Sequence, residues 1–322
     1  MAWEQGVNYY KIELPVSTTS IASGLANFTT RSNLADEVIQ LFAGDLQGNL
    51  WKLDFTNKLP ADWTTTQLSY YSDGSAPIPM YVAKDGAGNR QPITMPPFLG
   101  YGPNRTLIVA FGTGKYLESD DNSGPYRTQS IYALLDNNSA SPDSSSPTAA
   151  IAGRGRLQAA TAGSDGSITS TAFAWGRPLS DSDTGTRSGW YVDMYTSSST
   201  GERQVSPFTV FGSKVYSGTV IPPQTSCEIG SGRSYAIDLY AASGSSFKSD
   251  VGILGEPFVI AVGADALTTS DSVDQAVRTT TGRIVLQGSG ALKNASGTTA
   301  VTKVFRMSWR QINNYQELKA AP

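Results

Sequence analysis

The sequence of 322 residues contains no histidine and only one cysteine, Cys227. The absence of histidine excludes a Ser-His-Asp triad, a Cys-His pair and His-ligated zinc, and it removes the usual acid–base group near neutral pH. One cysteine allows neither an internal disulfide nor a CxxC metal site. Cys227 lies in a polar loop pattern, and two interpretations stay open for it: an intermolecular thiol or nucleophile, and a free thiol without a role.

Charged residues and long apolar runs are also scarce. Charged residues make up 16% of the chain, against about 25% in typical globular proteins. The net charge is −3 and no basic stripe is present, so nucleic-acid binding is not expected. No apolar run approaches the roughly 18 residues that cross a bilayer, and the first residues (MAWEQG) show no signal peptide. This beginning fits either a cytosolic protein or a piece excised from a secreted one.

Turn-forming residues and short apolar runs dominate what is present. Gly occurs 32 times and Pro 17 times, and Ser and Thr are abundant, which is typical of many short strands joined by turns. The runs Val38–Ala43 and Leu50–Phe55 flank a turn with Gly and Asn and predict a β-hairpin. Alternation in the second run places Trp51, Leu53 and Phe55 on one side, which predicts that one face of this strand packs on the core.

Further strands are predicted in the same way. They are Thr106–Phe111 with Gln129–Asp136, Pro207–Val220 with a turn at Gly212-Ser213, Arg233–Leu239, Pro257–Val262 with Arg283–Gln287, and Lys303–Trp309. Residues 137–147 and 175–189 have the polar composition of surface loops, and only Asp271–Arg278 and Trp309–Ala320 favour helical turns.

Three strands end in a shared aromatic–apolar–Asp pattern, at Asp54, Asp136 and Asp238. Their unequal spacing is not that of a strict blade repeat, but degenerate blades with long insertions produce both the shared endings and the irregular gaps. We therefore predict an all-β fold, a modified and irregular β-propeller with long loop insertions, that forms a single domain over residues 1–322.

Acidic loops provide candidate metal ligands. One cluster contains Asp120 and Asp121, and another contains Asp181 and Asp183. Calcium prefers several closely spaced oxygen ligands on a Gly-containing loop, but neither cluster completes the D-x-[DN]-x-[DN]-G pattern. Each cluster is therefore interpreted either as a weak calcium site or as a solvated loop.

Five segments, taken in order along the chain, are similar to conserved blocks of one family. They are Ala43–Asp54 (AGDLQGNLWKLD); Phe111–Leu117 (FGTGKYL) with Asp120-Asp121 and Gln129–Tyr132; Gly189–Asp193 (GWYVD) with Gly201–Arg203; Cys227 with Gly230, Gly232 and Asp238; and Arg306–Arg310 (RMSWR). Together they resemble the PilC/PilY-type family of type IV pilus biogenesis and tip adhesins. The matching order of all five makes the resemblance more specific than any one block.

The resemblance implies a modified β-propeller at the C-terminus of a long secreted protein that sits at the pilus tip or outer membrane. Such proteins support pilus assembly against retraction and mediate surface attachment. Minor pilins or a pilus tip complex are the implied partners, with an unidentified host or abiotic receptor. The implied location is the cell surface, reached through the periplasm. The adhesive N-terminal region of the family is missing, which favours the interpretation of Met1 as the start of an excised piece.

The resemblance also bears on calcium. Family members often carry an Asp-rich calcium loop before the first of these blocks, and its last ligand would match Asp36. The earlier ligand positions fall on Phe28, Thr30 and Ser32, with Leu34 as the backbone ligand. Phe offers no side-chain oxygen, and Thr and Ser are weak ligands beside carboxylates. We predict that this site is degenerate or lost, with Asp36 as its sole remnant. No cofactor is assigned, and a calcium site assembled from distant carboxylates stays open.

Two other functions stay open. A quinoprotein-like dehydrogenase propeller would need carboxylate and metal ligands around a central site. A glycan-binding, lectin-like propeller would bind sugars through exposed aromatic residues such as Tyr70-Tyr71 or Trp190-Tyr191. We predict the function that the resemblance implies, a non-enzymatic binding module for pilus biogenesis and attachment, which also agrees with the strand pattern and the missing histidine.

Overall fold

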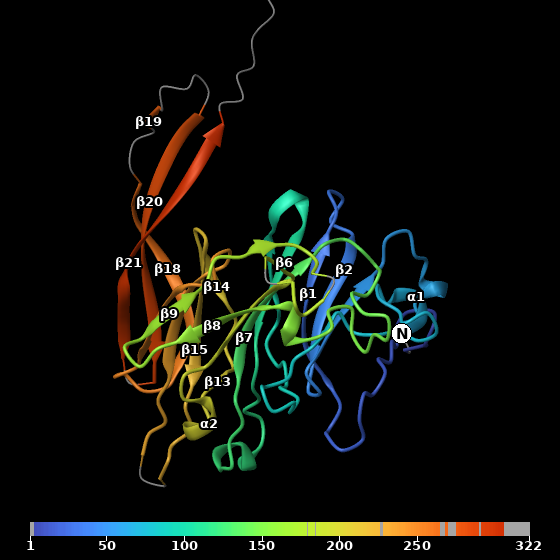
Figure 1. Ribbon diagram of the computed structural model, residues 1–322, viewed down its shortest axis with the longest axis horizontal. Helices are drawn as coiled ribbons and strands as arrows, with labels where there is room; N and C mark the ends of the chain where they lie inside the picture. The colour runs from blue at the N-terminus through green and yellow to red at the C-terminus, as the bar shows by residue number, and fades with distance from the viewer. Residues whose placement is uncertain are drawn as a thin grey trace, which may run out of the picture.

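The computed structural model describes residues 3–305 except 179, 184, 226–227, 265–267, 270–274 and 290. The all-β prediction is confirmed: strands lie side by side in a curled arrangement that ends in a long ribbon (Figure 1). Helical structure in the described ranges is limited to α1 (Thr65–Leu68), α2 (Ser197–Thr200) and the 3₁₀ turns η1 (Pro60–Asp62), η2 (Pro103–Arg105), η3 (Ser119–Asn122) and η4 (Arg154–Arg156). None of the helices within these ranges has the length and apolar character that a membrane span requires.

The first sheet is antiparallel with the order β1-β2-β3-β4. Its strands are β1 (Leu25–Ser32), β2 (Val38–Asp45), β3 (Asn49–Asp54) and β4 (Tyr81–Val82). The predicted hairpin is confirmed as β2 and β3, which pair from Gln40–Asp54 to Gly44–Leu50. The prediction of a single buried face on β3 is wrong, because Leu50 and Lys52 are buried as well as Trp51 and Leu53. Strand β3 is covered on both faces, and Lys52 is accommodated there by an acidic partner.

A second, larger sheet runs in the order β13-β15-β16-β17-β9-β8-β12-β7-β6-β5, with β14 paired to β15. Its strands are β5 (Phe98–Tyr101), β6 (Leu107–Gly112), β7 (Ser130–Asp136), β8 (Gln158–Ala162), β9 (Ser167–Ser170), β12 (Gly189–Asp193), β13 (Arg203–Gln204), β14 (Thr209–Phe211), β15 (Lys214–Val220), β16 (Arg233–Asp238) and β17 (Gly244–Lys248). The predicted pairs β6–β7 and β14–β15 are confirmed. Strands that a regular propeller would divide among blades are thus joined edge to edge.

Two smaller elements complete the described fold. β10 (Ala174–Trp175) and β11 (Thr186–Arg187) form a short parallel pair. β18 (Leu254–Ala264), β19 (Thr268–Thr269), β20 (Gln275–Gly288) and β21 (Leu292–Phe305) form the ribbon. The predicted partnership of residues 257–262 with 283–287 is confirmed, since β18 pairs with β20 there.

The helical turn predicted for Asp271–Arg278 is wrong where the structure describes it. Residues 275–278 belong to β20, which pairs with β21 from Gln275 to Gln287. A long ladder of backbone hydrogen bonds outweighs the weak local helix preference. The strand predicted at Lys303–Trp309 is confirmed up to Phe305, and its remainder lies outside the described residues, as do the predicted helix Trp309–Ala320 and Cys227.

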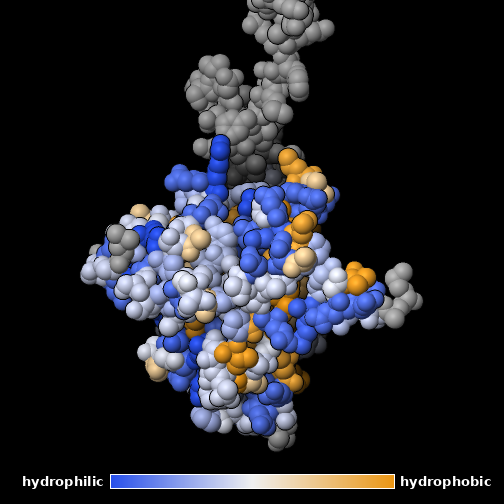
Figure 2. Space-filling view, turned by 90° about the vertical axis from the view of Figure 1, so that its right-hand side faces the viewer, coloured by the Kyte–Doolittle hydropathy of each residue, from blue (hydrophilic) through white to orange (hydrophobic). Residues whose placement is uncertain are grey.

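Strands β6 and β7 are buried on both faces and separate two apolar clusters. One cluster receives Leu107, Val109 and Phe111 from β6, and the other receives Ile108 and Ala110. The side chains of β7 alternate between the clusters in the same way. Strands covered on both faces read as continuous apolar runs, which explains the sequence of β6. On the face shown in Figure 2, hydrophilic residues predominate and apolar ones form small separate patches.

A buried ion pair joins the first sheet to the second. Lys52 Nζ on β3 lies 2.6 Å from Asp136 Oδ2 on β7, and neither side chain has exposed surface. The ammonium also lies 3.5 Å from the ring centroid of Tyr70, and the Tyr71 hydroxyl donates to Asp136 Oδ1 (3.4 Å). Burial lowers the pKa of Lys52, and the charge of Asp136 offsets this only in part. Two of the three strand-end Asp patterns are thereby linked through one contact.

We expect Asp136→Asn to lower the free energy of unfolding by about 3–5 kcal/mol, because it leaves the Lys52 ammonium buried without a counter-charge. The double variant Lys52→Met/Asp136→Asn should lose clearly less free energy of unfolding than Asp136→Asn, since it buries no charge at this position. Urea unfolding followed by tryptophan fluorescence measures both.

Glu13→Gln is the control for this pair, because the Lys11–Glu13 ion pair is exposed and should contribute nothing measurable. If the single and double variants lose equal free energies of unfolding, the buried Lys52 ammonium does not need the charge of Asp136 for its stability.

Candidate functional site

The turn between β2 and β3 is organised by the carboxylate of Asp45. Its Oδ1 accepts hydrogen bonds from the backbone N–H groups of Gln47 (2.9 Å) and Asn49 (2.8 Å), and its Oδ2 accepts from Asn49 Nδ2 (2.8 Å) and Trp51 Nε1 (3.0 Å). Gly48 adopts a φ of +76° in this turn, and a Cβ there would lie 2.6 Å from a neighbouring carbonyl oxygen. The segment AGDLQGNLW therefore forms one fixed turn.

A second turn of the same kind lies beside the first. Asp85 accepts hydrogen bonds from two backbone N–H groups (2.9 and 2.8 Å) and from Asn89 Nδ2 (2.9 Å), so the pattern Asp-x-x-Gly-Asn occurs twice. Burial alone would raise the pKa of Asp85, but these hydrogen bonds hold it below its usual value. The next residue, Arg90, donates from NH1 to the carbonyl of Gln47 (2.8 Å) and to Asn49 Oδ1 (3.0 Å). Arg90 thus ties the two turns together.

The glycines of FGTGKYL make room for strand β13. A Cβ on Gly112 would lie 1.9 Å from Oε1 of Gln204, and one on Gly114 would lie 2.4 Å from the Cβ of Arg203. Gly114 also has a φ of +131°, which side chains rarely permit. Two segments that are far apart in the sequence therefore meet because neither glycine carries a side chain.

The Arg203 side chain lies between two tyrosines. Its Nε donates to the carbonyl of Gly201 and its NH1 to the carbonyl of Lys115, both at 2.7 Å. Its guanidinium carbon lies 5.7 Å from the ring centroid of Tyr116 and 5.6 Å from that of Tyr126. Burial lowers the pKa of Arg203, but a guanidinium stays protonated at neutral pH. Arg203 therefore holds a fixed positive charge against an aromatic wall.

The candidate ligands Asp120 and Asp121 lie on η3, next to Lys115. Asp121 accepts hydrogen bonds from the backbone N–H groups of Leu117 (2.9 Å) and Glu118 (3.0 Å), and Lys115 Nζ lies 3.3 Å from its Oδ1. Burial would raise the pKa of Asp121, but these donors and the Lys115 charge lower it. Asp121 therefore already has a cationic partner, whereas Asp120 is exposed.

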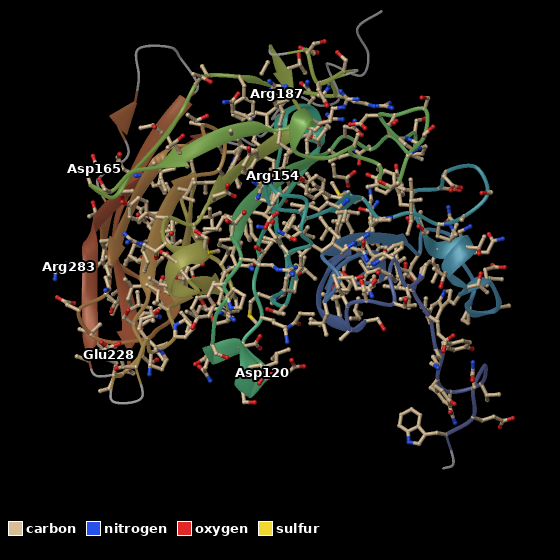
Figure 3. All side chains as sticks on the ribbon, turned by 60° about the horizontal axis from the view of Figure 1, so that its bottom comes forward. Asp120, Arg154, Asp165, Arg187, Glu228 and Arg283 are labelled. Atoms are coloured by element: carbon tan, nitrogen blue, oxygen red, sulfur yellow. The ribbon has the colours of Figure 1, made fainter. Side chains whose placement is uncertain are left out.

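These segments line one cleft of about 450 Å³, which we call the Arg90–Arg203 cleft. Segments from three of the five family-like blocks contribute to its walls, and Figure 3 shows Asp120 at the periphery of the molecule on η3. The size is that of a typical ligand site. The lining residues are Ser20, Ile21, Ala22, Leu46, Arg90, Pro92, Lys115, Leu117, Glu118, Asp120, Asp121, Ser123, Pro125, Tyr126, Arg127, Gln129, Gly201 and Arg203.

Positive charge prevails in this cleft, although the chain as a whole has a net charge of −3. Its lining contains four basic and three acidic side chains. Lys115 is paired with Glu118 and Asp121. Among the described residues, Arg90 and Arg127 form no ion pair. The cleft therefore presents two cations without a carboxylate partner.

Glu202 fixes the position of β13. Its buried carboxylate accepts hydrogen bonds from Thr219 Oγ1 (2.8 Å), the Tyr235 hydroxyl (3.0 Å) and Thr196 Oγ1 (2.7 Å), and it lies 3.7 Å from Arg233 Nε. These partners come from β15, β16 and the segment before α2. The Gly-Glu-Arg block therefore combines an internal anchor, Glu202, with a cleft residue that follows it.

The Asp36 position lies apart from this cleft, in the turn between β1 and β2, with a φ of +60°. Phe28, Thr30 and Ser32 are strand residues on β1, and Leu34 is exposed in the turn. Within the described part of the chain, no group of three or more acidic or Cys side chains is placed to hold a metal ion. Loss of the family calcium site stays a prediction.

The second acidic cluster lies elsewhere. Asp181 forms an ion pair with Arg156 NH1 (3.0 Å), and Asp183 accepts from two backbone N–H groups (3.2 Å each). Arg187 donates to the carbonyl of Asp183 (2.7 Å), and Figure 3 shows Arg187 on the opposite side of the molecule from Asp120. The structure therefore does not bring the two candidate clusters together.

Arg154 cross-links the interior between these sides (Figure 3). Its NH2 donates to Ser130 Oγ (2.7 Å), the Tyr132 hydroxyl (2.8 Å) and Asp193 Oδ1 (2.8 Å), and its guanidinium carbon lies 4.2 Å from the ring centroid of Tyr191. Burial raises the pKa of Tyr132, so its hydroxyl stays protonated. This network connects η4 with β7 and β12.

Sequence reasoning missed the basic residues of the cleft. Arg127 has no local motif, and Arg203 stands out in the sequence only as part of a family-like block. Arg90 had a usable signal, because it directly follows the second copy of the Asp-x-x-Gly-Asn pattern. Recognising this repeat would have placed Arg90 beside the first turn.

Gly114→Ala should destabilise the fold by about 1–3 kcal/mol more than Gly153→Ala. Gly153 has a nearly equal φ of +128°, but no other atom lies within 4 Å of the position that a Cβ would take there. Gly153→Ala therefore carries only the cost of placing a side chain on a backbone with positive φ. Gly114→Ala must in addition displace Arg203. Urea unfolding of both variants provides the comparison, and equal losses would show that β13 does not depend on this glycine.

Comparisons with known proteins agree with the geometry. A family model described as the PilY1 beta-propeller domain matches residues 4–172. A type IV pilus biogenesis factor PilY1 homolog of Xylella fastidiosa strain Temecula1 is 33% identical over 238 residues, which cover 72% of this chain and 15% of that protein. The type IV pilus biogenesis factor PilY1 of Pseudomonas aeruginosa strain PAO1 is 31% identical over 267 residues, covering 76% of this chain and 23% of that protein.

The chain therefore spans less than a quarter of the length of these curated relatives. The crystal structure of the Pseudomonas aeruginosa PilY1 C-terminal domain superposes with a TM-score of 0.57 at 21% identity, over 89% of this chain and 62% of that one. This likeness supports the propeller-like all-β fold, and the resemblance stated from the sequence is confirmed. The chain belongs to the PilY1 β-propeller family.

Proposed function

We propose that this chain is the C-terminal propeller domain of a longer type IV pilus biogenesis factor and acts as a non-enzymatic binding module. The observation that carries the proposal is its membership of the PilY1 family, whose curated relatives are named as type IV pilus biogenesis factors. In this proposal the chain works at the pilus tip or cell surface, supports pilus assembly against retraction and contributes to surface attachment.

The Arg90–Arg203 cleft is the contact surface that we assign to this role. Its walls include segments from three of the family-like blocks, and its shape is fixed by the two Asp-x-x-Gly-Asn turns and by Gly114. Minor pilins or a pilus tip complex are the proposed partners. A rigid cleft suits protein binding, because little conformational entropy is lost when a partner docks.

Deletion of the gene in its native host should abolish surface pili, and pili should return when retraction is also disabled. The physical reason is that a biogenesis factor shifts the balance between assembly and retraction. Electron microscopy of negatively stained cells counts pili in the four combinations of genotype.

Complementation with the unaltered full-length gene is the control for this experiment. Unchanged piliation after deletion would contradict the biogenesis role. Loss of pili that persists without retraction would contradict the specific role against retraction.

A second candidate function, glycan binding, is favoured by a groove of about 910 Å³ beside β2. Of the aromatic residues named for sugar binding from the sequence, Tyr71 and Trp190 are buried in the core. Instead, the groove contains Phe55 and Trp63, whose rings meet edge to face at 5.5 Å. Its other lining residues are Thr30, Asn33, Glu37, Val38, Ile39, Leu41, Thr56, Asn57, Lys58 and Leu59. Aromatic rings rimmed by amides and a carboxylate are suited to a saccharide.

Trp63→Ala should weaken saturable binding to the best oligosaccharide of a glycan array by about tenfold or more, because an aromatic platform is lost. Trp3→Ala is the matched control, since Trp3 is exposed outside the groove. If the array shows no saturable binding, or if both variants bind alike, glycan binding at this groove is excluded.

A further inference from the structure

Arg90 carries a charge that the described fold does not neutralise. Its guanidinium is only partly exposed, and its hydrogen bonds go to two neutral oxygens, the Gln47 carbonyl and Asn49 Oδ1. Burial lowers the pKa of Arg90, and the more distant charge of Asp45 offsets this only in part. Partly buried charges are normally paired, so a carboxylate supplied from outside would complete this arrangement.

The surroundings of Arg90 favour a peptide over a small anion. The same cleft has apolar side chains, among them Leu46, Pro92 and Leu117, and Leu117 is 66% exposed. Tyr126 adds an aromatic surface, and Arg127 stands exposed at the rim. Isolated carboxylates need no such apolar walls, whereas an extended peptide uses them for the residues next to its acidic side chain.

The acidic residues of the cleft limit the charge that it can accept. Glu118, Asp120 and Asp121 leave an excess of one positive charge among its seven charged side chains. A polyanion such as nucleic acid or a phosphorylated lipid surface would be repelled by these carboxylates, since like charges at close range are unfavourable. A single carboxylate between uncharged residues fits this balance.

We propose that the Arg90–Arg203 cleft binds an extended, acidic peptide segment of a partner protein, with the acidic side chain paired to Arg90 and steered by Arg127. The apolar neighbours of that side chain pack on Leu46, Leu117 and Tyr126. This proposal adds the chemistry of the bound segment to the binding role proposed above. Only the identity of the partner protein rests on that role.

The test selects binders from a phage-displayed library of random linear peptides on the purified chain. Enriched peptides should carry more Asp and Glu than the input library, each flanked by apolar residues. Fluorescence polarisation with the most enriched peptide then measures affinity, and replacing its acidic residue by the amide should weaken binding about tenfold or more. Binding should also weaken with rising salt.

Arg90→Gln and Arg127→Gln should each reduce the affinity for the acidic peptide and leave the affinity for its amide version unchanged. The matched control is Arg105→Gln, an exposed arginine at the opposite end of β6, which should have no effect. Circular dichroism and urea unfolding of Arg90→Gln check that the fold is retained, and Arg127→Gln, which has no partner among the described contacts, tests the charge without that concern.

Three results would overturn the proposal: selection without acidic enrichment, equal binding of the acid and amide peptides, or an equal effect of Arg105→Gln and Arg127→Gln. These outcomes are independent of the piliation experiment. A chain that is required for pili but fails the peptide test keeps its pilus role and loses this assignment of the cleft.

Discussion

The buried contact between Lys52 and Asp136 is the constraint on which the arrangement of the two main sheets depends. An ion pair without solvent is favourable only when its geometry is held closely, so β3 and β7 have little freedom to slide or separate. The aromatic rings of Tyr70 and Tyr71 enclose the pair and complete its environment. The position of β2 and its turn relative to β6 and β7 depends on this contact together with the apolar cluster that β2, β3, β6 and β7 share.

The cleft is built on that fixed frame. Its first wall extends from the turn at Asp45, and its second extends from β6 through Gly114. The third wall is formed by β13, whose position is held by the buried carboxylate of Glu202. The first and third walls are therefore anchored by buried carboxylates, Asp45 and Glu202, and not by the loop alone. This explains why the family-like blocks combine glycines, which permit close approach, with Asp or Glu residues whose hydrogen bonds define one conformation.

The sequence allowed the strand pairs to be predicted because each consists of apolar runs around a turn, as in β2–β3 and β6–β7. It misled where alternation was taken to mean one solvated face: Lys52 looks polar in the chain but lies in the core, since its partner is distant in sequence. It also misled at residues 275–278, where a long strand ladder outweighs local preference. The cleft could not be predicted, because Arg90, Arg127 and Arg203 meet only in the folded chain.

The same separation explains why the acidic residues were more conspicuous than the basic ones that give the cleft its character. Asp120 and Asp121 are adjacent and suggest a metal loop. Asp121, however, already forms an ion pair with Lys115 and accepts hydrogen bonds from two backbone N–H groups. Arg90 is a lone residue in the sequence, yet its fixed position between two turns leaves its charge uncompensated. A carboxylate that is satisfied within the fold stabilises structure, whereas a cation held without a counter-charge is available to a partner. The binding role proposed for this chain is therefore assigned to the arginines of the cleft and not to its acidic loops.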